Sequence, residues 1–185
     1  PTTHFAPRNP MDSVAKITVW DPPRRFVAET EEGPGKVATE WTVQTRSGDS
    51  CVVRVVHSWF ATTDDWDQEF EGHTYGWLSF FRLLRLYLTH FPGARGASFQ
   101  VMGTTPPPKE VAWKSLMGGL GIPAAKVGAK VPTQGDAPQL AGTVEWAGQP
   151  EWPEELVLRL DTPAVGIAHF APHPMSGKVF LALRF

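Results

Sequence analysis

The stretch KVATEWTVQTRSGDSCVVRVVHSWF, from Lys36 to Phe60, decides the fold. Its first half alternates: positions 37, 39, 41 and 43 fall on one side of a strand, and the polar residues at 40, 42, 44 and 46 fall on the other. Ser47-Gly48-Asp49 is typical of a hairpin turn, and the residues from Cys51 to Trp59 form the returning strand. The stretch therefore predicts a long antiparallel hairpin.

Two shorter strands precede this hairpin. Residues 14–20 and 26–29 each have strand character, and Asp21-Pro22-Pro23 separates them. The two prolines predict a turn, because proline cannot donate a hydrogen bond to a sheet ladder. Four strands joined by short turns predict an antiparallel meander.

The apolar period changes after the hairpin. Steps of four and three residues, which define one face of an amphipathic helix, separate Trp77, Phe81, Leu84, Leu88 and Phe91. Acidic residues near position 64 suit the first turn of a helix, and Pro92-Gly93 suits its end. We expect one long helix over residues 64–91.

A second, smaller α+β unit is expected after this helix. Strands are predicted over residues 97–102, 140–146, 156–160 and 178–185, a short helix over 111–117, and a loop over 121–138. Ala141-Gly-Thr-Val-Glu-Trp146 weakly echoes Ala15-Lys-Ile-Thr-Val-Trp20. We therefore expect two domains, residues 1–93 and 94–185, of which the second completes or packs on the first sheet as a related half-unit.

Composition excludes several classes of protein. The chain of 185 residues carries 17 basic and 19 acidic side chains, a balance that argues against a nucleic-acid-binding protein. The single cysteine, Cys51, excludes an intramolecular disulfide and a cysteine-rich zinc module. No run approaches the ~18 apolar residues of a membrane span, and the first residues do not resemble a signal peptide. A cytoplasmic location is the expectation.

The order of these motifs resembles the START/Bet v-like (SRPBCC) superfamily. Ile17-Thr-Val-Trp-Asp-Pro-Pro-Arg-Arg-Phe26, the hairpin to His57-Ser-Trp-Phe60, and Gly76-Trp77 through Tyr87-Leu88 are similar to bacterial homologues of the activator of heat-shock-protein-90 ATPase. The resemblance covers residues 14–91, about 40% of the chain. It implies a helix-grip fold, in which a curved antiparallel sheet wraps around one long C-terminal helix.

One part of the family pattern is missing. Such domains open with a strand and a helix, and nothing before Val14 can supply them. The segment 98–116 looks like this missing opening, so two explanations stay open. Either the chain is a fragment in which a second copy begins near residue 98, which the first residue Pro1 favours, or the segment completes the first sheet in a permuted order.

The resemblance also implies a hydrophobic cavity between the sheet and the helix. The residues expected to line it are Trp41, His57, Trp59, Trp77, Phe81 and Leu84. The eight Trp and eleven Phe residues suit either such a cavity or a core that they fill completely. Which face of the strand over residues 51–59 lines the cavity is not settled by alternation alone.

The sequence gives little support for a catalytic site or a metal site. His57 lies in an apolar strand, where a histidine is more often structural than functional. Glu69 and His73 supply only two ligands, and a proline between His169 and His173 argues against a helical metal pair. Cys51 has no visible base nearby. We therefore expect no catalytic residues, no metal and no cofactor.

Three classes of function stay open. The preferred one is a non-catalytic protein that binds a hydrophobic small molecule of lipid or polyketide type. The second is a cyclase- or aromatase-like enzyme that uses the same cavity, with His57, Arg54 or Glu40 as the nearby polar groups. The third is a chaperone co-factor or another protein-interaction module. A homodimer and a chaperone are the possible protein partners.

Overall fold

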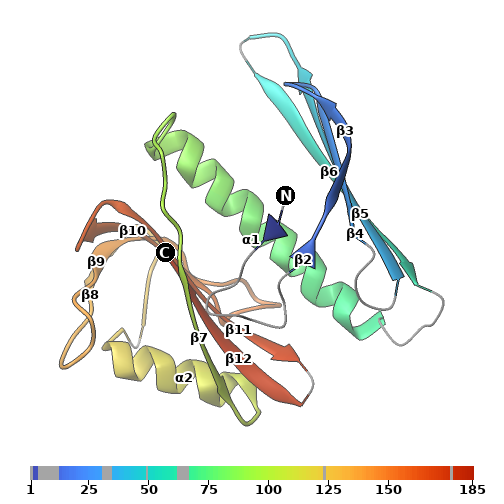
Figure 1. The fold of residues 1–185 in the computed structure, drawn as a ribbon. Helices are drawn as coiled ribbons and strands as arrows, with labels where there is room; N and C mark the ends of the chain where they lie inside the picture. The colour runs from blue at the N-terminus through green and yellow to red at the C-terminus, as the bar shows by residue number, and fades with distance from the viewer. Residues whose placement is uncertain are drawn as a thin grey trace. The chain divides into compact units, whose positions relative to one another are not determined.

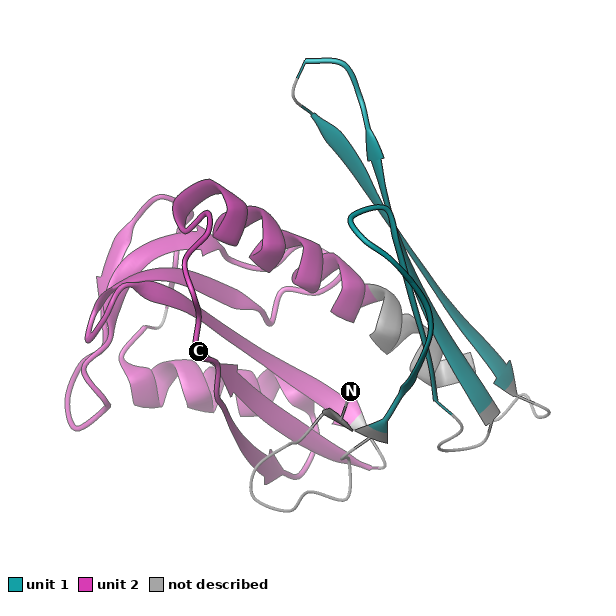
Figure 2. Cartoon of the chain, turned by 45° about the horizontal axis from the view of Figure 1, so that its top comes forward, with its two compact units in different colours: residues 1–71 teal, residues 72–185 magenta. Residues whose placement is uncertain are grey.

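The computed structural model describes residues 2–3, 13–30, 35–48, 50–61, 67–122, 124–175 and 177–185. Within these ranges the fold is α+β, with antiparallel sheets and two helices. The chain forms two compact units, residues 1–71 (unit 1) and residues 72–185 (unit 2), shown in Figure 2. This boundary differs from the predicted division after residue 93, and most of the long helix falls in unit 2. The assignment of domains stays a prediction.

Unit 1 contains the predicted meander (Figure 1). Its four strands pair in chain order: β3 (Lys16–Asp21), β4 (Arg25–Thr30), β5 (Gly35–Thr45) and β6 (Cys51–Ala61). A separate short pair is formed by β1 (Thr2–Thr3) and β2 (Ser13–Val14).

The register of the hairpin confirms the predicted alternation. Trp41 of β5 lies opposite Val55 of β6, and Thr39 lies opposite His57. On the other side of β5, Trp41 lies opposite Phe26 of β4. Because opposed residues in an antiparallel pair share a face, Trp41, His57 and Phe26 lie on one side of the sheet.

Unit 1 buries little of its apolar surface. Within its described ranges, Val27 is the one apolar residue classed as buried. Large apolar side chains are exposed on both faces, Trp20 to 69% and Phe60 to 61%. Exposed aromatic surface on this scale is typical of a binding surface.

Unit 2 contains a six-stranded antiparallel sheet in the order β7-β12-β11-β10-β9-β8. Its elements follow α1 (Asp67–His90), whose first residues belong to unit 1. They are β7 (Gln100–Thr105), α2 (Lys109–Leu120), β8 (Lys130–Pro132), β9 (Ala141–Trp146), β10 (Leu156–Thr162), β11 (Gly166–Met175) and β12 (Lys178–Arg184).

Several of these elements differ from expectation. The strand β11 was not predicted, and β8 lies inside the predicted loop. The strand β7 pairs with β12, so residues 100–105 extend the sheet of unit 2 and not the four-stranded sheet of unit 1. None of the helices within the described ranges is both long and apolar enough to span a membrane.

Helix α2 begins and ends where its sequence dictates. Pro108 stands at its N-cap, where a missing N–H costs nothing, and Glu110 lies in the first turn. The helix ends at Gly121, whose φ of 70° is left-handed and suits glycine. The N–H of Ile122 then donates to the carbonyl of Met117 at 2.9 Å, which satisfies an end carbonyl.

The two helices contact opposite faces of the unit 2 sheet (Figures 1 and 2). Met117 and Leu120 of α2 pack in a cluster with Leu156, Leu158 and Phe170 of β10 and β11. His169, which neighbours Phe170 in β11, faces the opposite way and joins a polar cluster with α1. The α2 side of the sheet is therefore an apolar core, and the α1 side carries charge.

We predict that Gly142→Ala destabilises unit 2. A Cβ at position 142 in β9 would lie 2.3 Å from the carbonyl oxygen of Arg159, so the strands must shift. The free energy of unfolding should fall by roughly 1–3 kcal/mol. Gly103→Ala in β7 is the control, because its Cβ meets nothing within 4 Å. Urea denaturation followed by tryptophan fluorescence measures both, and equal effects would contradict the register of β9 with β10.

Candidate functional site

One face of the four-stranded sheet in unit 1 gathers large aromatic side chains. Trp20 lies opposite Phe26, and Phe26 lies opposite Trp41, on three adjacent strands. The rings of Trp20 and Phe26 pack edge to face, with centroids 5.8 Å apart at 90°. His57 and Trp59 lie on the same face, further along β6. We call this surface the aromatic face.

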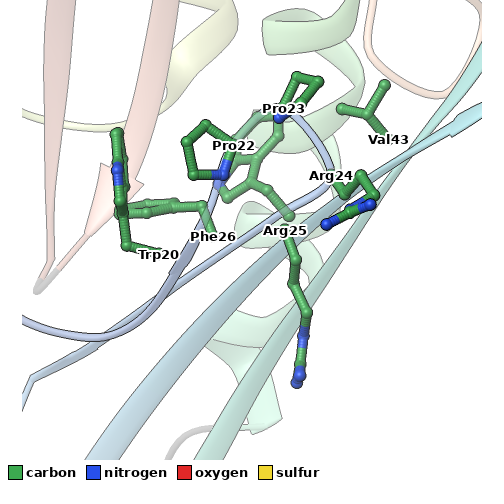
Figure 3. Close-up of a pocket in the computed structure, with 8 residues that line it drawn as sticks. Trp20, Pro22, Pro23, Arg24, Arg25, Phe26 and Val43 are labelled. Carbon is green, nitrogen blue, oxygen red and sulfur yellow. The ribbon is translucent and has the colours of Figure 1, made fainter.

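A pocket of about 190 Å³ opens at the end of the aromatic face (Figure 3). Figure 3 shows the proline rings of the predicted turn beside Trp20 and Phe26. The full lining consists of Trp20, Pro22, Pro23, Arg24, Arg25, Phe26, Trp41 and Val43. Pockets for drug-sized ligands occupy ~300–1,000 Å³, so this one suits one or two rings of a ligand.

The two arginines beside the pocket are already paired. Arg24 donates from Nε and Nη2 to the Asp21 carboxylate at 3.1 and 3.0 Å. Arg25 Nε lies 2.8 Å from Glu40 Oε1. The hydrogen bond from Arg24 lowers the pKa of Asp21, so the carboxylate stays charged at neutral pH. The pocket therefore carries no net charge from these four groups.

His57 is held by its neighbours in the sheet. Trp59 Nε1 donates to His57 Nε2 at 2.7 Å, and Thr39 Oγ1 lies 2.8 Å from His57 Nδ1. Because an indole N–H can only donate, Nε2 is the acceptor, and a neutral ring carries its proton on Nδ1. Both ring nitrogens are engaged in these contacts, which suits a residue that holds its neighbours on the aromatic face in place.

The six predicted cavity residues fall into two groups. Trp41, His57 and Trp59 lie together on the aromatic face of unit 1. Trp77, Phe81 and Leu84 lie on α1, with the Trp77 and Phe81 ring centroids 6.4 Å apart. Each group is described within its own unit, and a shared cavity lined by all six residues stays a prediction.

A second cluster lies in unit 2, between α1 and the sheet. Its centre is the Glu155 carboxylate, in a residue only 4% exposed. The Ser79 hydroxyl donates to Oε1 of Glu155, and Arg82 Nη1 lies 2.8 Å from Oε2. His169, which is 2% exposed, places Nε2 2.9 Å from Oε1. We call this group, with Arg184, the buried polar cluster.

The cluster extends to side chains from neighbouring strands on the same face of the sheet. Arg184 of β12 donates from Nη1 to His169 Nδ1 at 3.3 Å and from Nε to Gln100 Oε1 at 2.8 Å. Arg82 also donates to Gln149 Oε1 at 3.2 Å and lies 3.8 Å from the centroid of the Trp146 ring. Five strands and loops therefore converge on a few polar side chains.

Two effects compete at Glu155. Burial, the largest influence, raises the pKa of its carboxyl group. Hydrogen bonds from His169 and Ser79, together with the charge of Arg82, outweigh burial and leave the pKa below its ordinary value. Glu155 is therefore ionised at neutral pH although it is buried.

Three buried side-chain polar atoms in unit 2 have no hydrogen-bond partner among the described residues: Nε2 of His173, Nε1 of Trp146 and Oε2 of Glu154. The last of these forms an ion pair with Lys109 Nζ at 2.9 Å. His173 lies four residues after His169 on the same face of β11. Burial, and then the charge of Arg184, lower the pKa of His173 to about 4. Its ring is therefore neutral at pH 7.

The described ranges contain no group of three or more side chains placed to bind a metal ion. The side chains of Glu69 and His73 lie outside the described residues. Cys51 is an exposed free thiol at the start of β6.

Sequence reasoning did not find the buried polar cluster. Its members come from α1, from the loop before β10, from β11 and from β12, and Ser79 and Glu155 are 76 positions apart. One signal was available: Glu155 directly precedes the apolar run of β10, where a charged residue at the edge of a core needs a partner.

No family model and no curated protein sequence matches this chain. One solved structure aligns with it: the crystal structure of DynU16, described as a protein in the dynemicin biosynthetic locus. The two chains are 17% identical with a TM-score of 0.34, and the alignment covers 94% of this chain. The chain spans 66% of the length of the DynU16 chain.

We predict that Glu155→Gln strongly destabilises unit 2. The amide leaves Arg82 without its charge partner, and loss of one member of a buried pair costs roughly 3–5 kcal/mol. The matched control is Glu145→Gln, which breaks a more exposed pair with Arg159 and should cost about 1 kcal/mol or less. Similar losses in urea denaturation would argue against a structural role for Glu155.

The lowered pKa of His173 predicts a stability that depends on pH. The unfolded chain takes up this proton near pH 6.5, but the folded chain does so only near pH 4. The folded state should therefore lose up to roughly 3 kcal/mol as the pH falls across this window. His173→Gln should remove this loss, while His90→Gln, at the exposed end of α1, should retain it. Denaturation at pH 7, 5.5 and 4.5 gives the comparison.

Proposed function

We propose that the protein is a non-catalytic binding protein for a neutral, hydrophobic small molecule with a flat ring system. The observation that carries the proposal is the pocket of unit 1, in which six of the eight lining residues are apolar. Aromatic rings and prolines offer flat surfaces, and flat ring systems stack well against them.

The exposure of the aromatic face supports the same function. Trp20 keeps 69% of its surface exposed, next to a pocket that Trp41 and Phe26 also line. Removing apolar surface from water is worth about 25 cal/mol per Å². The complex with a ligand that covers this surface is therefore stabilised without any specific polar contact.

The charges near the pocket favour a neutral ligand and argue against catalysis. Arg24 and Arg25 are each paired with a carboxylate, so neither offers an unpaired charge to an anionic substrate. His57 engages both ring nitrogens with Thr39 and Trp59. A general base would need one of those nitrogens to face the ligand.

The helix-grip fold and the START/Bet v-like family belong to this proposal. Their support is the order of elements, a four-stranded antiparallel meander followed by a long helix. In that family pattern, Trp77, Phe81 and Leu84 on the helix add apolar surface for the ligand.

The proposal is tested with Nile red, a neutral fluorescent probe with fused rings. Trp41→Ala and Phe26→Ala should each weaken its binding by about tenfold, because each removes one ring from the pocket wall. Phe60→Ala is the matched control, since Phe60 is exposed on the opposite face of the same sheet. Trp77→Ala tests the contribution predicted for α1.

Circular dichroism must show that each variant is folded. Unchanged affinity in both pocket variants, or an equal loss in Phe60→Ala, would contradict the assignment of the pocket. A loss in Trp77→Ala as well as in the pocket variants would support the helix-grip arrangement of the ligand site.

A further inference from the structure

On the α1 side of the unit 2 sheet, Arg184 has no carboxylate in direct contact among the described residues. Two other arginines on this side have direct ion-pair partners: Arg82 pairs with Glu155 at 2.8 Å, and Arg159 pairs with Glu145 at 2.7 Å. Within the ranges that the structure describes, no carboxylate forms an ion pair with Arg184. Glu155 acts on Arg184 only at longer range, and it already accepts from Arg82.

The polar partners of Arg184 are both neutral. Gln100 Oε1 accepts from its Nε at 2.8 Å, and His169 Nδ1 accepts from its Nη1 at 3.3 Å. A guanidinium group has no lone pair to offer, so Nδ1 of His169 carries no proton. His169 must then hold its proton on Nε2, where it donates to Glu155. The histidine therefore orients the arginine without adding charge.

His173 supplies an unused polar atom on the same face. It lies opposite Phe180 of β12, four residues from the Arg184–His169 pair along both strands. Between these two pairs stands a pair of small residues, Ala171 and Ala182. Its Nε2 is buried without a hydrogen-bond partner in the described part of the chain. Buried polar atoms in native proteins are rarely left in that state, so an unsatisfied one points to a ligand or water.

We propose that Arg184, together with His169 and His173, binds the carboxylate group of a small organic acid on this face of unit 2. Arg184 supplies the charge and His173 a hydrogen bond from Nε2, while His169 positions the guanidinium group. This site is separate from the aromatic pocket of unit 1 and does not depend on it.

The charge balance selects a carboxylate over a phosphate. The guanidinium fork matches both groups in shape. However, Arg184 carries a single positive charge with no carboxylate in direct contact among the described residues, and one carboxylate matches that charge. A phosphate dianion would leave a net negative charge beside the buried Glu155 carboxylate, and this residual charge is costly at low exposure.

The test uses the full chain with benzoate as the probe and benzamide as its neutral analogue. Benzoate binding, measured by calorimetry, should weaken about tenfold or more in Arg184→Gln, because a charge-assisted contact is lost. Arg159→Gln is the matched control: it removes an arginine from the same sheet that is already paired with Glu145, and it should change the affinity by less than about twofold. Benzamide should bind weakly to all three proteins.

A measurement on the unaltered protein covers the case in which Arg184→Gln does not fold. Nitrogen-15 NMR of the histidine rings should show the His173 Nε2 resonance shifting with added benzoate and not with benzamide. Three results would overturn the proposal: no binding of benzoate to the unaltered protein, equal binding in Arg184→Gln, or tighter binding of inorganic phosphate than of benzoate.

Discussion

Both candidate sites depend on the alternation of side chains along antiparallel strands. In unit 1, pairing across three strands brings Trp20, Phe26 and Trp41 to one face, although each lies in a different segment of the sequence. In unit 2, the same rule separates Phe170 from His169. A shift of one residue in either register would send the aromatic or the charged side chains to the wrong face.

The two units differ in how the two faces of their sheets are stabilised. Unit 2 places an apolar core on the α2 side of its sheet and balances the buried Glu155 carboxylate on the other side. Because a buried charge is costly, the contacts of Glu155 with Ser79 and Arg82 fix which face of α1 meets the sheet. Unit 1 leaves large apolar side chains exposed in its described ranges, and the proposed ligand would cover part of that surface.

Local patterns in the sequence predicted the meander and the long helix. They left open which face of β6 lies beside Trp41, and the register with β5 places His57 on that face. They missed β11, because Pro172 and Pro174 look like loop residues. The pairing gives the reason why a strand tolerates them. The strand β10 pairs only with residues 166–170 of β11, so both prolines lie where β12 is the single partner strand.

The contacts of Glu155 could not be predicted from the sequence for another reason. Its partners Ser79 and Arg82 stand more than 70 positions away, and alternation within a strand says nothing about which helix covers it. The pocket was only partly predictable. Trp41 was expected to line a cavity, but the wall made by Pro22 and Pro23 follows from the geometry of the turn.

The central claim is that the aromatic pocket of unit 1 binds a neutral, flat, hydrophobic molecule. The most direct test follows the indole N–H resonances of the eight tryptophans by NMR while Nile red is added. The account predicts that Trp20 and Trp41, which line the pocket, shift together in a saturable way, while Trp113, beside the unit 2 core, stays in place. Shifts confined to tryptophans of unit 2, or no saturable shift at Trp20 and Trp41, would contradict it.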